Sequence, residues 1–303
     1  MRSVQQTERR TRAVEAQTRD MRAYVRAVHA YLQGHDAAAA RIARRLAHRP
    51  GMPDAQYLLG LLYLRGRGVE RDQAVGLAWI ERAAAGGSAL AEAELASRYF
   101  SGNGVPRDPH LARGWARKAG THGQLRGQRV LCALDFRAHR TPGARHWCGK
   151  AARRGDALSQ FFLARLLQDT GPQQARRHAR NWMQRAAKQG WLPAQTKLGD
   201  YYHDGVGGSR NDRRALYWWR RAAGRGNARA QVALARAYAN GWGIKRDPLS
   251  AYVWLCRARA QGIDDHRLRH RLRRDLSAGQ RRRAAHLARS IGNQRGAAPT
   301  SDQ

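Results

Sequence analysis

A pair of glycines in the stretch LRGRGVERD, residues 64–72, resembles a loop that binds phosphate. A phosphate loop of that kind occurs once, after a strand, and a lysine and a hydroxyl residue follow it. Here the pair occurs four times, each time between two segments with helical spacing. The pairs are Gly66 and Gly68, Gly102 and Gly104, Gly205 and Gly207, and Gly241 and Gly243. The recurrence predicts a turn between helices, in which glycine supplies the left-handed conformation.

Two groups of histidines and cysteines have spacings that metal sites use. His266 and His270 stand four residues apart on an expected helix, but no third ligand is near and neighbouring arginines repel a cation. Residues 132–148 contain two cysteines and two histidines, yet Cys132 fills a small-residue position and Cys148 follows a core tryptophan. Packing explains both groups better than a metal. We therefore expect no catalytic residue, no metal and no cofactor, and no enzyme activity.

Positive charge dominates the composition. Among 303 residues, 57 are Lys or Arg and 22 are Asp or Glu, for a net charge of +35. A GC-rich genome alone produces an excess of Arg, Ala and Gly, but it does not explain the shortage of carboxylates. A surface this basic favours nucleic acid, anionic lipid or an acidic protein as partner. Codon bias combined with solubility is the competing interpretation.

The sequence predicts a cytoplasmic location. Its first 20 residues lack the apolar core of a secretory signal, and no segment approaches the length of a membrane helix. Three cysteines without a secretory context are typical of buried small residues in a reducing cytosol. A signal peptide upstream of Met1 would instead place the protein in the periplasm.

Two markers recur together along the chain at intervals of 32 to 36 residues. The first is a leucine followed by a small residue, at Leu59, Leu95, Leu131, Leu163, Leu198 and Leu234. The second is a tryptophan, at Trp79, Trp115, Trp147, Trp182, Trp218 and Trp254. Each tryptophan is followed three residues later by a base and then by alanine. Matching steps in both markers indicate an internal repeat.

Each repeat has the spacing of two helices. Apolar residues at i, i+3, i+4, i+7 and i+8 from Ala55 form one helical face, and Trp79 lies on a second helix. The residues expected to build the repeat in the first unit are Leu59, Gly60, Tyr63, Gly66, Gly68, Asp72, Trp79 and Ala83. Asp72 and its equivalents are placed to cap the second helix. A single pair is too small to bury its own core, so neighbouring pairs must stack.

A glutamine or glutamate follows the first small residue of every unit. These side chains are Gln56, Glu92, Gln128, Gln160, Gln195 and Gln231. We interpret the series as a hydrogen-bond ladder between repeats and not as a ligand site. Trp191, Trp219 and Trp242 lie outside the repeat position and are freer to contact a partner.

The pattern A-x-x-x-L-G-x-x-Y-x-x-G-x-G-V-x-x-D-x(6)-W-x-x-[KR]-A-A-x-x-G resembles the Sel-one-like repeat (SLR), a relative of the tetratricopeptide repeat. The stretches AQYLLGLLYLRGRGVERDQAVGLAWIERAAAGG and AQVALARAYANGWGIKRDPLSAYVWLCRARAQG fit it well. The resemblance implies an all-α, right-handed α-solenoid of helix-turn-helix repeats that acts as an adaptor for other proteins. The third and fourth units depart from the pattern, and Asp135 stands where an aromatic residue is expected.

The sequence divides into five segments. We expect residues 1–16 to be disordered or frayed and residues 17–53 to form a degenerate capping helix pair. Six repeats follow over residues 54–262. Residues 263–292 are expected to form basic capping helices, with a capping box at Ser277 and Gln280, and residues 293–303 a disordered tail.

Arginines are concentrated in the C-terminal helices. Six of them are the candidate partner-binding residues, namely Arg267, Arg271, Arg274, Arg281, Arg282 and Arg283. A guanidinium group binds phosphates and carboxylates with two parallel hydrogen bonds. We expect a scaffold whose basic surface steers an acidic segment of a partner protein. The alternative is a nucleic-acid-binding protein that uses these arginines for phosphate contacts.

Overall fold

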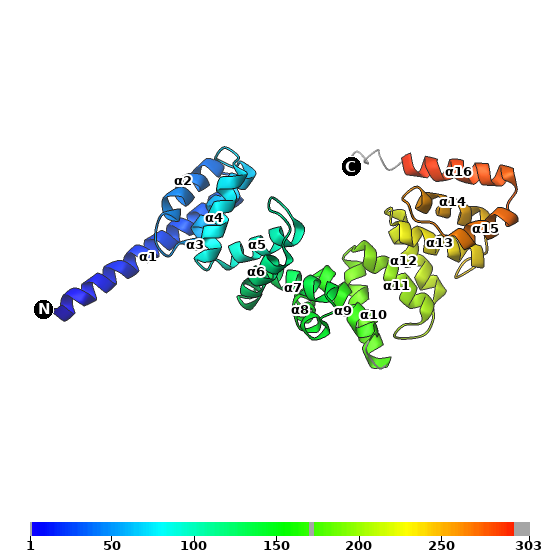
Figure 1. Cartoon of the computed structure of the whole chain (residues 1–303), viewed down its shortest axis with the longest axis horizontal. Helices are drawn as coiled ribbons and strands as arrows, with labels where there is room; N and C mark the ends of the chain where they lie inside the picture. Colours follow the sequence, from blue (N-terminus) through cyan, green and yellow to red (C-terminus); the bar gives the residue numbers. More distant parts are fainter. Residues whose placement is uncertain (1, 170–172, 294–303) are drawn as a thin grey trace. The chain divides into compact units, whose positions relative to one another are not determined.

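The computed structural model describes residues 2–169 and 173–293, and over these residues it contains sixteen helices and no strand (Figure 1). The first eight are α1 (Arg2–Leu32), α2 (Asp36–Ala47), α3 (Pro53–Arg65), α4 (Gln73–Ala85), α5 (Ala89–Ser101), α6 (Pro109–Thr121), α7 (Leu125–Arg137) and α8 (Thr141–Arg153). The others are α9 (Ala157–Asp169), α10 (Gln173–Lys188), α11 (Leu192–Asp204), α12 (Asp212–Gly224), α13 (Ala228–Asn240), α14 (Pro248–Arg259), α15 (His266–Asp275) and α16 (Ala278–Asn293). The chain is an all-α solenoid of helix-turn-helix repeats, as the periodicity predicts.

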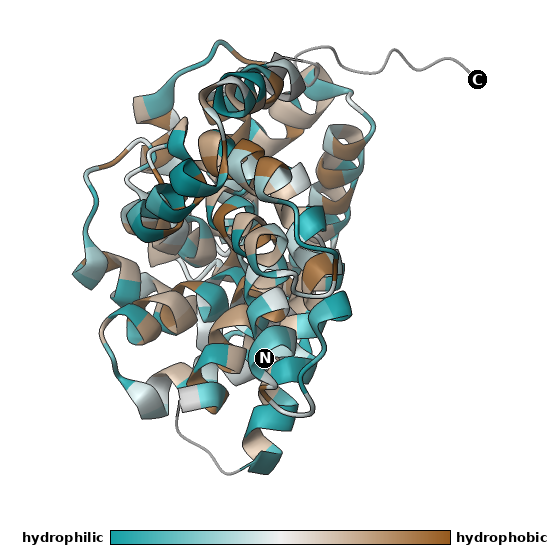
Figure 2. Ribbon diagram, turned by 90° about the vertical axis from the view of Figure 1, so that its right-hand side faces the viewer, coloured by the Kyte–Doolittle hydropathy of each residue, from teal (hydrophilic) through white to brown (hydrophobic). Residues whose placement is uncertain are grey.

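The solenoid divides into two compact units, Met1–Trp147 and Cys148–Gln303, here called unit 1 and unit 2. Within each unit, hydrophobic and hydrophilic residues, brown and teal in Figure 2, alternate along the helices. This pattern lets each helix bury one face against its neighbours. Each cluster of buried side chains joins consecutive helices, so the core is continuous along a unit.

The glycine pair is a turn between helices. Gly66 ends α3 in the left-handed region with φ 66°, and Gly102, Gly205 and Gly241 end α5, α11 and α13 in the same way. Asp72 then caps α4, because its Oδ1 accepts a hydrogen bond from the Val75 backbone N–H at 2.9 Å. The capping residue at the other three turns is Asp108, Asn211 or Asp247. These findings confirm the interpretation of the loop as a hinge.

The second glycine of the pair has a further role, which is to let two repeats approach. A Cβ atom added to Gly68 would lie 2.2 Å from the carbonyl oxygen of Asp36, at the start of α2. Gly207 meets the first turns of α10 in the same manner, and Gly243 meets the start of α12. These three second glycines therefore form backbone contacts with the preceding helix pair, whereas Gly104 meets the Gln73 side chain at the start of α4. Since Gly68 meets α2, the pair α1 and α2 stacks on the array as a preceding repeat does.

Small residues also bring the two helices of a repeat together. A Cβ added to Gly60 would lie 2.8 Å from the Gly76 carbonyl oxygen, and a Cβ on Gly76 would lie 2.9 Å from the Gly60 carbonyl oxygen. The backbones of α3 and α4 thus touch where they cross. Leu59 and Ala83 are almost completely buried beside this crossing.

The N-terminal helix differs from the expectation. Helix α1 begins at Arg2, whereas the sequence predicts a disordered or frayed segment over residues 1–16. The physical reason is composition, since alanine, glutamate, glutamine and arginine between residues 12 and 17 are good helix formers and no glycine or proline interrupts them. The segment can therefore continue the helix whose later turns pack against α2.

The C-terminal helices are joined by the predicted capping box. The Gln280 backbone N–H donates to Ser277 Oγ at 3.2 Å, and the Ser277 backbone N–H donates to Gln280 Oε1 at 2.8 Å. The leucine ridge of α15 is buried with Ala284 against α14. The expected tail, residues 293–303, lies outside the described residues except for Asn293, which ends α16.

Candidate interaction surface

The repeated polar side chains serve the stacking of repeats. Gln195 Nε2 donates to the Ala187 carbonyl oxygen at 3.1 Å, near the end of the preceding helix α10. Gln56, Gln128, Gln160 and Gln231 make the same bond to the helix before them. Four of these carbonyl oxygens also accept from the backbone N–H of the glycine that follows the helix, such as Gly190 N–H to Ala187 at 3.0 Å, so the glutamine is a second donor at the helix end. The predicted ladder between repeats is confirmed for the five glutamines. It is wrong for Glu92, whose Oε2 lies 2.8 Å from His122 Nδ1 instead.

The repeated tryptophans lie at the edge of the core, where five are half-buried and Trp218 is 8% exposed. The W-x-x-[KR] pattern has a physical reason, which is a contact between the base and the tryptophan ring. Lys118 Nζ lies 4.6 Å from the centroid of the Trp115 ring, and equivalent pairs form at Trp79, Trp182 and Trp254. A cation over an aromatic face is attracted by the ring quadrupole. The base therefore covers the side of the ring that the core leaves open.

The three tryptophans outside the repeat position differ in how far they are buried. Trp219 is only 2% exposed, and its Nε1–H donates to Asp200 Oδ1 at 3.1 Å, so the expectation that it is free for a partner is wrong. It fills the space that Gly199 leaves between α11 and α12. Trp242 is half-buried and its ring centroid lies 4.1 Å from that of His203. Trp191 is 37% exposed.

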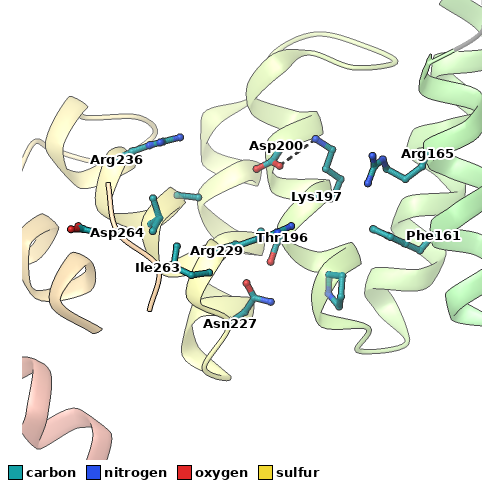
Figure 3. A pocket seen from close by; sticks show the side chains of 13 residues that line it. Phe161, Arg165, Thr196, Lys197, Asp200, Asn227, Arg229, Arg236, Ile263 and Asp264 are labelled. Carbon is teal, nitrogen blue, oxygen red and sulfur yellow. Dashed lines mark ion pairs between the residues drawn. The ribbon is translucent and has the colours of Figure 1, made fainter. Parts of the chain in front are cut away.

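A hollow in unit 2 runs along the first helices of consecutive repeats. This unit 2 groove, with a volume of about 640 Å³, is lined from α9, α11, α13 and the segment after α14 (Figure 3). Its lining residues are Phe161, Arg165, Pro193, Thr196, Lys197, Asp200, Asn227, Arg229, Val232, Ala233, Arg236, Ile263 and Asp264. Thr196 and Val232 occupy equivalent positions in their repeats, as do Asp200 and Arg236. Stacking thus aligns the same helix positions along one channel.

The lining of the unit 2 groove has four cations and two carboxylates, and one of the cations, Arg236, also pairs with Asp265 outside the lining, at 2.8 Å between Nε and Oδ2. Both carboxylates already have cationic partners. Asp200 Oδ2 lies 3.5 Å from Lys197 Nζ, and Asp264 Oδ2 lies 3.0 Å from Arg269 Nη1. Burial raises the pKa of Asp200, while Lys197 and the Trp219 N–H oppose that rise. Arg229 is exposed and, within the described part of the chain, it has no ion-pair partner.

A smaller hollow of about 310 Å³ adjoins this groove at Asp200, Ala233 and Arg236. Trp242 and His203 form its aromatic side. His203 Nδ1 lies 2.7 Å from Asp212 Oδ1, a contact that ties the end of α11 to the start of α12. The two hollows together place cations beside an aromatic surface.

None of the lining residues of this groove is among the six arginines predicted to bind a partner. These residues were not predicted because they occupy positions that differ from repeat to repeat, such as Lys197 against Ala233. A usable signal was nevertheless present. Some positions on the first helices do not repeat and carry charge in consecutive units. Because stacking of repeats does not require such charges, they indicate a surface with another role.

The structure separates the six C-terminal arginines by environment. Arg267, Arg274, Arg282 and Arg283 are exposed. Arg271 is half-buried, and its Nη2 donates to Asn240 Oδ1 at 3.0 Å. Arg281 Nη1 donates to the Arg273 and Leu276 carbonyl oxygens at 2.8 and 2.7 Å, so it joins the end of α15 to α16. Two of the six arginines therefore hold helices in place.

We expect Arg281→Ala to lower the free energy of unfolding by about 1–2 kcal/mol, because two carbonyl groups lose a charged donor. Arg282→Ala removes a neighbouring exposed arginine and should change stability by less than about 0.5 kcal/mol. Urea unfolding of both variants, followed by circular dichroism, measures the difference. Equal effects would show that the two carbonyl bonds contribute nothing.

Neither group of histidines and cysteines forms a metal cluster in the described residues, where no three His, Cys, Asp or Glu side chains converge. His266 Nδ1 instead accepts from Arg269 Nη2 at 2.7 Å. Cys132 and Cys148 are each disulfide-bonded, and Cys256 is a free thiol. Both are completely buried, as the packing interpretation predicts, but the expectation that they are reduced is wrong. The cysteines therefore do not indicate a reducing compartment.

Stacked helix pairs that bury a shared core define a helical-repeat protein. The sequence matches the Sel1 repeat at residues 53–88, 89–124, 142–156, 157–191, 192–227 and 228–263, more than half of the chain. The chain belongs to the Sel1 repeat family. The third match is short and omits α7, the region where the repeat pattern is weakest.

Two solved structures illustrate the similarity. A protective antigen with an SLR fold, present in uropathogenic Escherichia coli strains, is 26% identical with a TM-score of 0.74 over 88% of this chain. This chain covers 61% of the length of that antigen. A Sel1 repeat protein from Oxalobacter formigenes is 25% identical, with a TM-score of 0.57 over 95% of this chain and 90% of its own. No curated protein matches the sequence.

Sel1 repeat proteins generally mediate protein–protein interactions and are generally non-enzymatic. In the part of the chain that the structure describes, no helix is long and apolar enough to cross a bilayer.

Proposed function

We propose that this protein is a non-enzymatic scaffold that binds an acidic segment of a partner protein in the unit 2 groove. The observation that carries the proposal is the excess of cations in a groove built from aligned repeat positions. Arg229 contributes most clearly, because it is exposed and unpaired among the described residues. The partner's carboxylates would replace water around Arg229 and Lys197, and the chain's net charge of +35 would speed their approach.

A labelled peptide tests this proposal. The probe is a fluorescein-labelled 12-residue peptide of alternating glutamate and alanine, and its control has glutamine in place of glutamate. We expect the glutamate peptide to bind more tightly, and Arg229→Glu to weaken it about tenfold, since a favourable charge becomes a repulsive one. Fluorescence anisotropy at constant ionic strength measures the dissociation constants.

Arg282→Glu is the matched control for that experiment. It makes the same change in charge at an exposed arginine on α16, outside the unit 2 groove. We expect it to leave peptide binding within about twofold of wild type, because a distant charge is screened at physiological salt. If both reversals weaken binding equally, the peptide recognises net charge and the groove has no special role.

The alternative function is nucleic-acid binding by the C-terminal helices. Four exposed arginines, Arg267, Arg274, Arg282 and Arg283, favour it. This function predicts that a 20-base-pair DNA duplex binds with a steep dependence on salt, and that Arg282→Glu with Arg283→Glu reduces both affinity and slope. Duplex binding that is unaffected by this double variant argues against the alternative.

A further inference from the structure

Helix α1 carries a row of apolar side chains that are exposed in the part of the chain that the structure describes. Nine large apolar side chains are exposed in the described part of the chain, and four of them are on α1. Val14 is 62% exposed, Met21 51%, Val25 59% and Leu32 73%. A single exposed apolar residue is ordinary, but four on one helix call for a reason.

The four side chains form one narrow stripe. They are spaced seven, four and seven residues apart, which is the heptad pattern of a coiled-coil seam. At about 100° per residue, they fall within roughly 40° of one another around the helix axis. We call these four residues the α1 stripe.

The stripe is distinct from the face that α1 uses for folding. Tyr24, Ala27, Val28 and Tyr31 pack on α2 and α3 in the core of unit 1. The N-terminal half of α1 runs clear of α2, α3 and α4 (Figure 1). The α1 stripe therefore begins on this free half and continues along the outer side of the packed half.

Charge identifies the kind of occupant. Arg19, Arg22 and Arg26 are exposed on the side of α1 opposite the packed face, and Arg22 is the nearest of them to the stripe, at about 80° around the helix axis. Glu15 is the exposed carboxylate on the same side. A partner with carboxylates beside its own apolar stripe would pair with Arg22, as flanking charges do in coiled coils, and Arg19 and Arg26 add to the positive potential that attracts it.

We propose that the α1 stripe docks an acidic amphipathic helix of a partner protein. A second copy of this chain fits less well, because pairing would bring the arginines of two copies together. A lipid surface also fits less well, since membrane-surface helices present a broad apolar face and this stripe has the width of a coiled-coil seam. The proposal is independent of the unit 2 groove, which lies on other helices.

Two synthetic peptides test the proposal with the full chain. Both are 28-residue helices with leucine at positions a and d of each heptad. One has glutamate at positions e and g, and the other has lysine there. We expect only the glutamate peptide to bind in fluorescence anisotropy. Met21→Ser with Val25→Ser should weaken its binding at least about tenfold, because two apolar contacts are lost.

Matched variants distinguish binding at the α1 stripe from non-specific hydrophobic binding. Leu90→Ser with Leu111→Ser changes two exposed leucines elsewhere in unit 1 and should leave the affinity unchanged. Arg22→Glu with Arg26→Glu should reverse the preference, so that the lysine peptide binds more tightly. All of these variants also carry Arg229→Glu, so that binding of glutamate in the unit 2 groove does not contribute to the measured affinity.

Three results would overturn the proposal. The first is glutamate-peptide binding that survives the Met21 and Val25 substitutions. The second is stripe-dependent self-association in analytical ultracentrifugation, which would assign the stripe to a second copy. The third is stripe-dependent binding to phosphatidylglycerol vesicles without binding of the glutamate peptide, which would assign it to lipid.

Discussion

Replacing Gly68 with alanine is expected to lower the free energy of unfolding by about 2–5 kcal/mol. Two costs add. Gly68 has φ 68°, where a side chain is strained, and its Cβ would lie 2.2 Å from the Asp36 carbonyl oxygen. Because that oxygen belongs to the backbone of α2, the clash can be relieved only by moving one helix pair against the next. We expect a lower urea midpoint, measured by circular dichroism.

Gly34→Ala is the control for this substitution. Gly34 also has a positive φ, 79°, but no atom lies within 4 Å of the position a Cβ would take. Its replacement should cost only the strain, about 1–2 kcal/mol. The difference between the two variants then measures the contact between helix pairs. Equal losses of stability would show that the close approach to α2 has no energetic weight.

Arg113→Met is expected to destabilise unit 1 by about 2–4 kcal/mol. Arg113 Nη1 lies 2.6 Å from Asp135 Oδ1, and the Asp135 side chain is 5% exposed. The variant leaves a buried carboxylate without its cation, and water reaches that site poorly. Thermal and urea unfolding both measure the loss. Adding Asp135→Asn should recover part of it, because the amide removes the uncompensated charge.

Arg126→Met is the surface counterpart. Arg126 pairs with Glu94 and its side chain is 52% exposed, so its loss should cost at most about 1 kcal/mol. Similar values for Arg113 and Arg126 would contradict the importance of burial at Asp135. A double variant no more stable than Arg113→Met alone would contradict the role of the carboxylate charge.

Local and repeated features could be predicted from the sequence. The helix pairs, the turn at Gly66, the cap at Asp72 and the glutamine ladder all follow from residues that recur at one spacing. They are predictable because each repeat contacts mainly its neighbours, so the same local interactions are selected again in every unit. The capping box at Ser277 could be predicted because its two residues stand only three positions apart on the chain.

Features that depend on one particular neighbouring residue could not be predicted from the sequence. Asp135 was visible in the sequence as a departure from the aromatic position, but its partner Arg113 lies 22 residues away on another helix. Gly143 makes room for that carboxylate, because a Cβ there would lie 2.5 Å from Asp135 Oδ2. Trp219 was expected to be free and is instead buried against Gly199.

By itself, the sequence determined the repeat, its family and the all-α solenoid. Only the tertiary structure decided which surfaces remain open. The charges of the unit 2 groove come from positions that do not repeat, and they meet only when α9, α11 and α13 stack. Helix α1 has two apolar faces, and the packing of α2 and α3 buries one of them. Periodicity identifies an apolar face, but whether a neighbour covers it depends on contacts between distant residues.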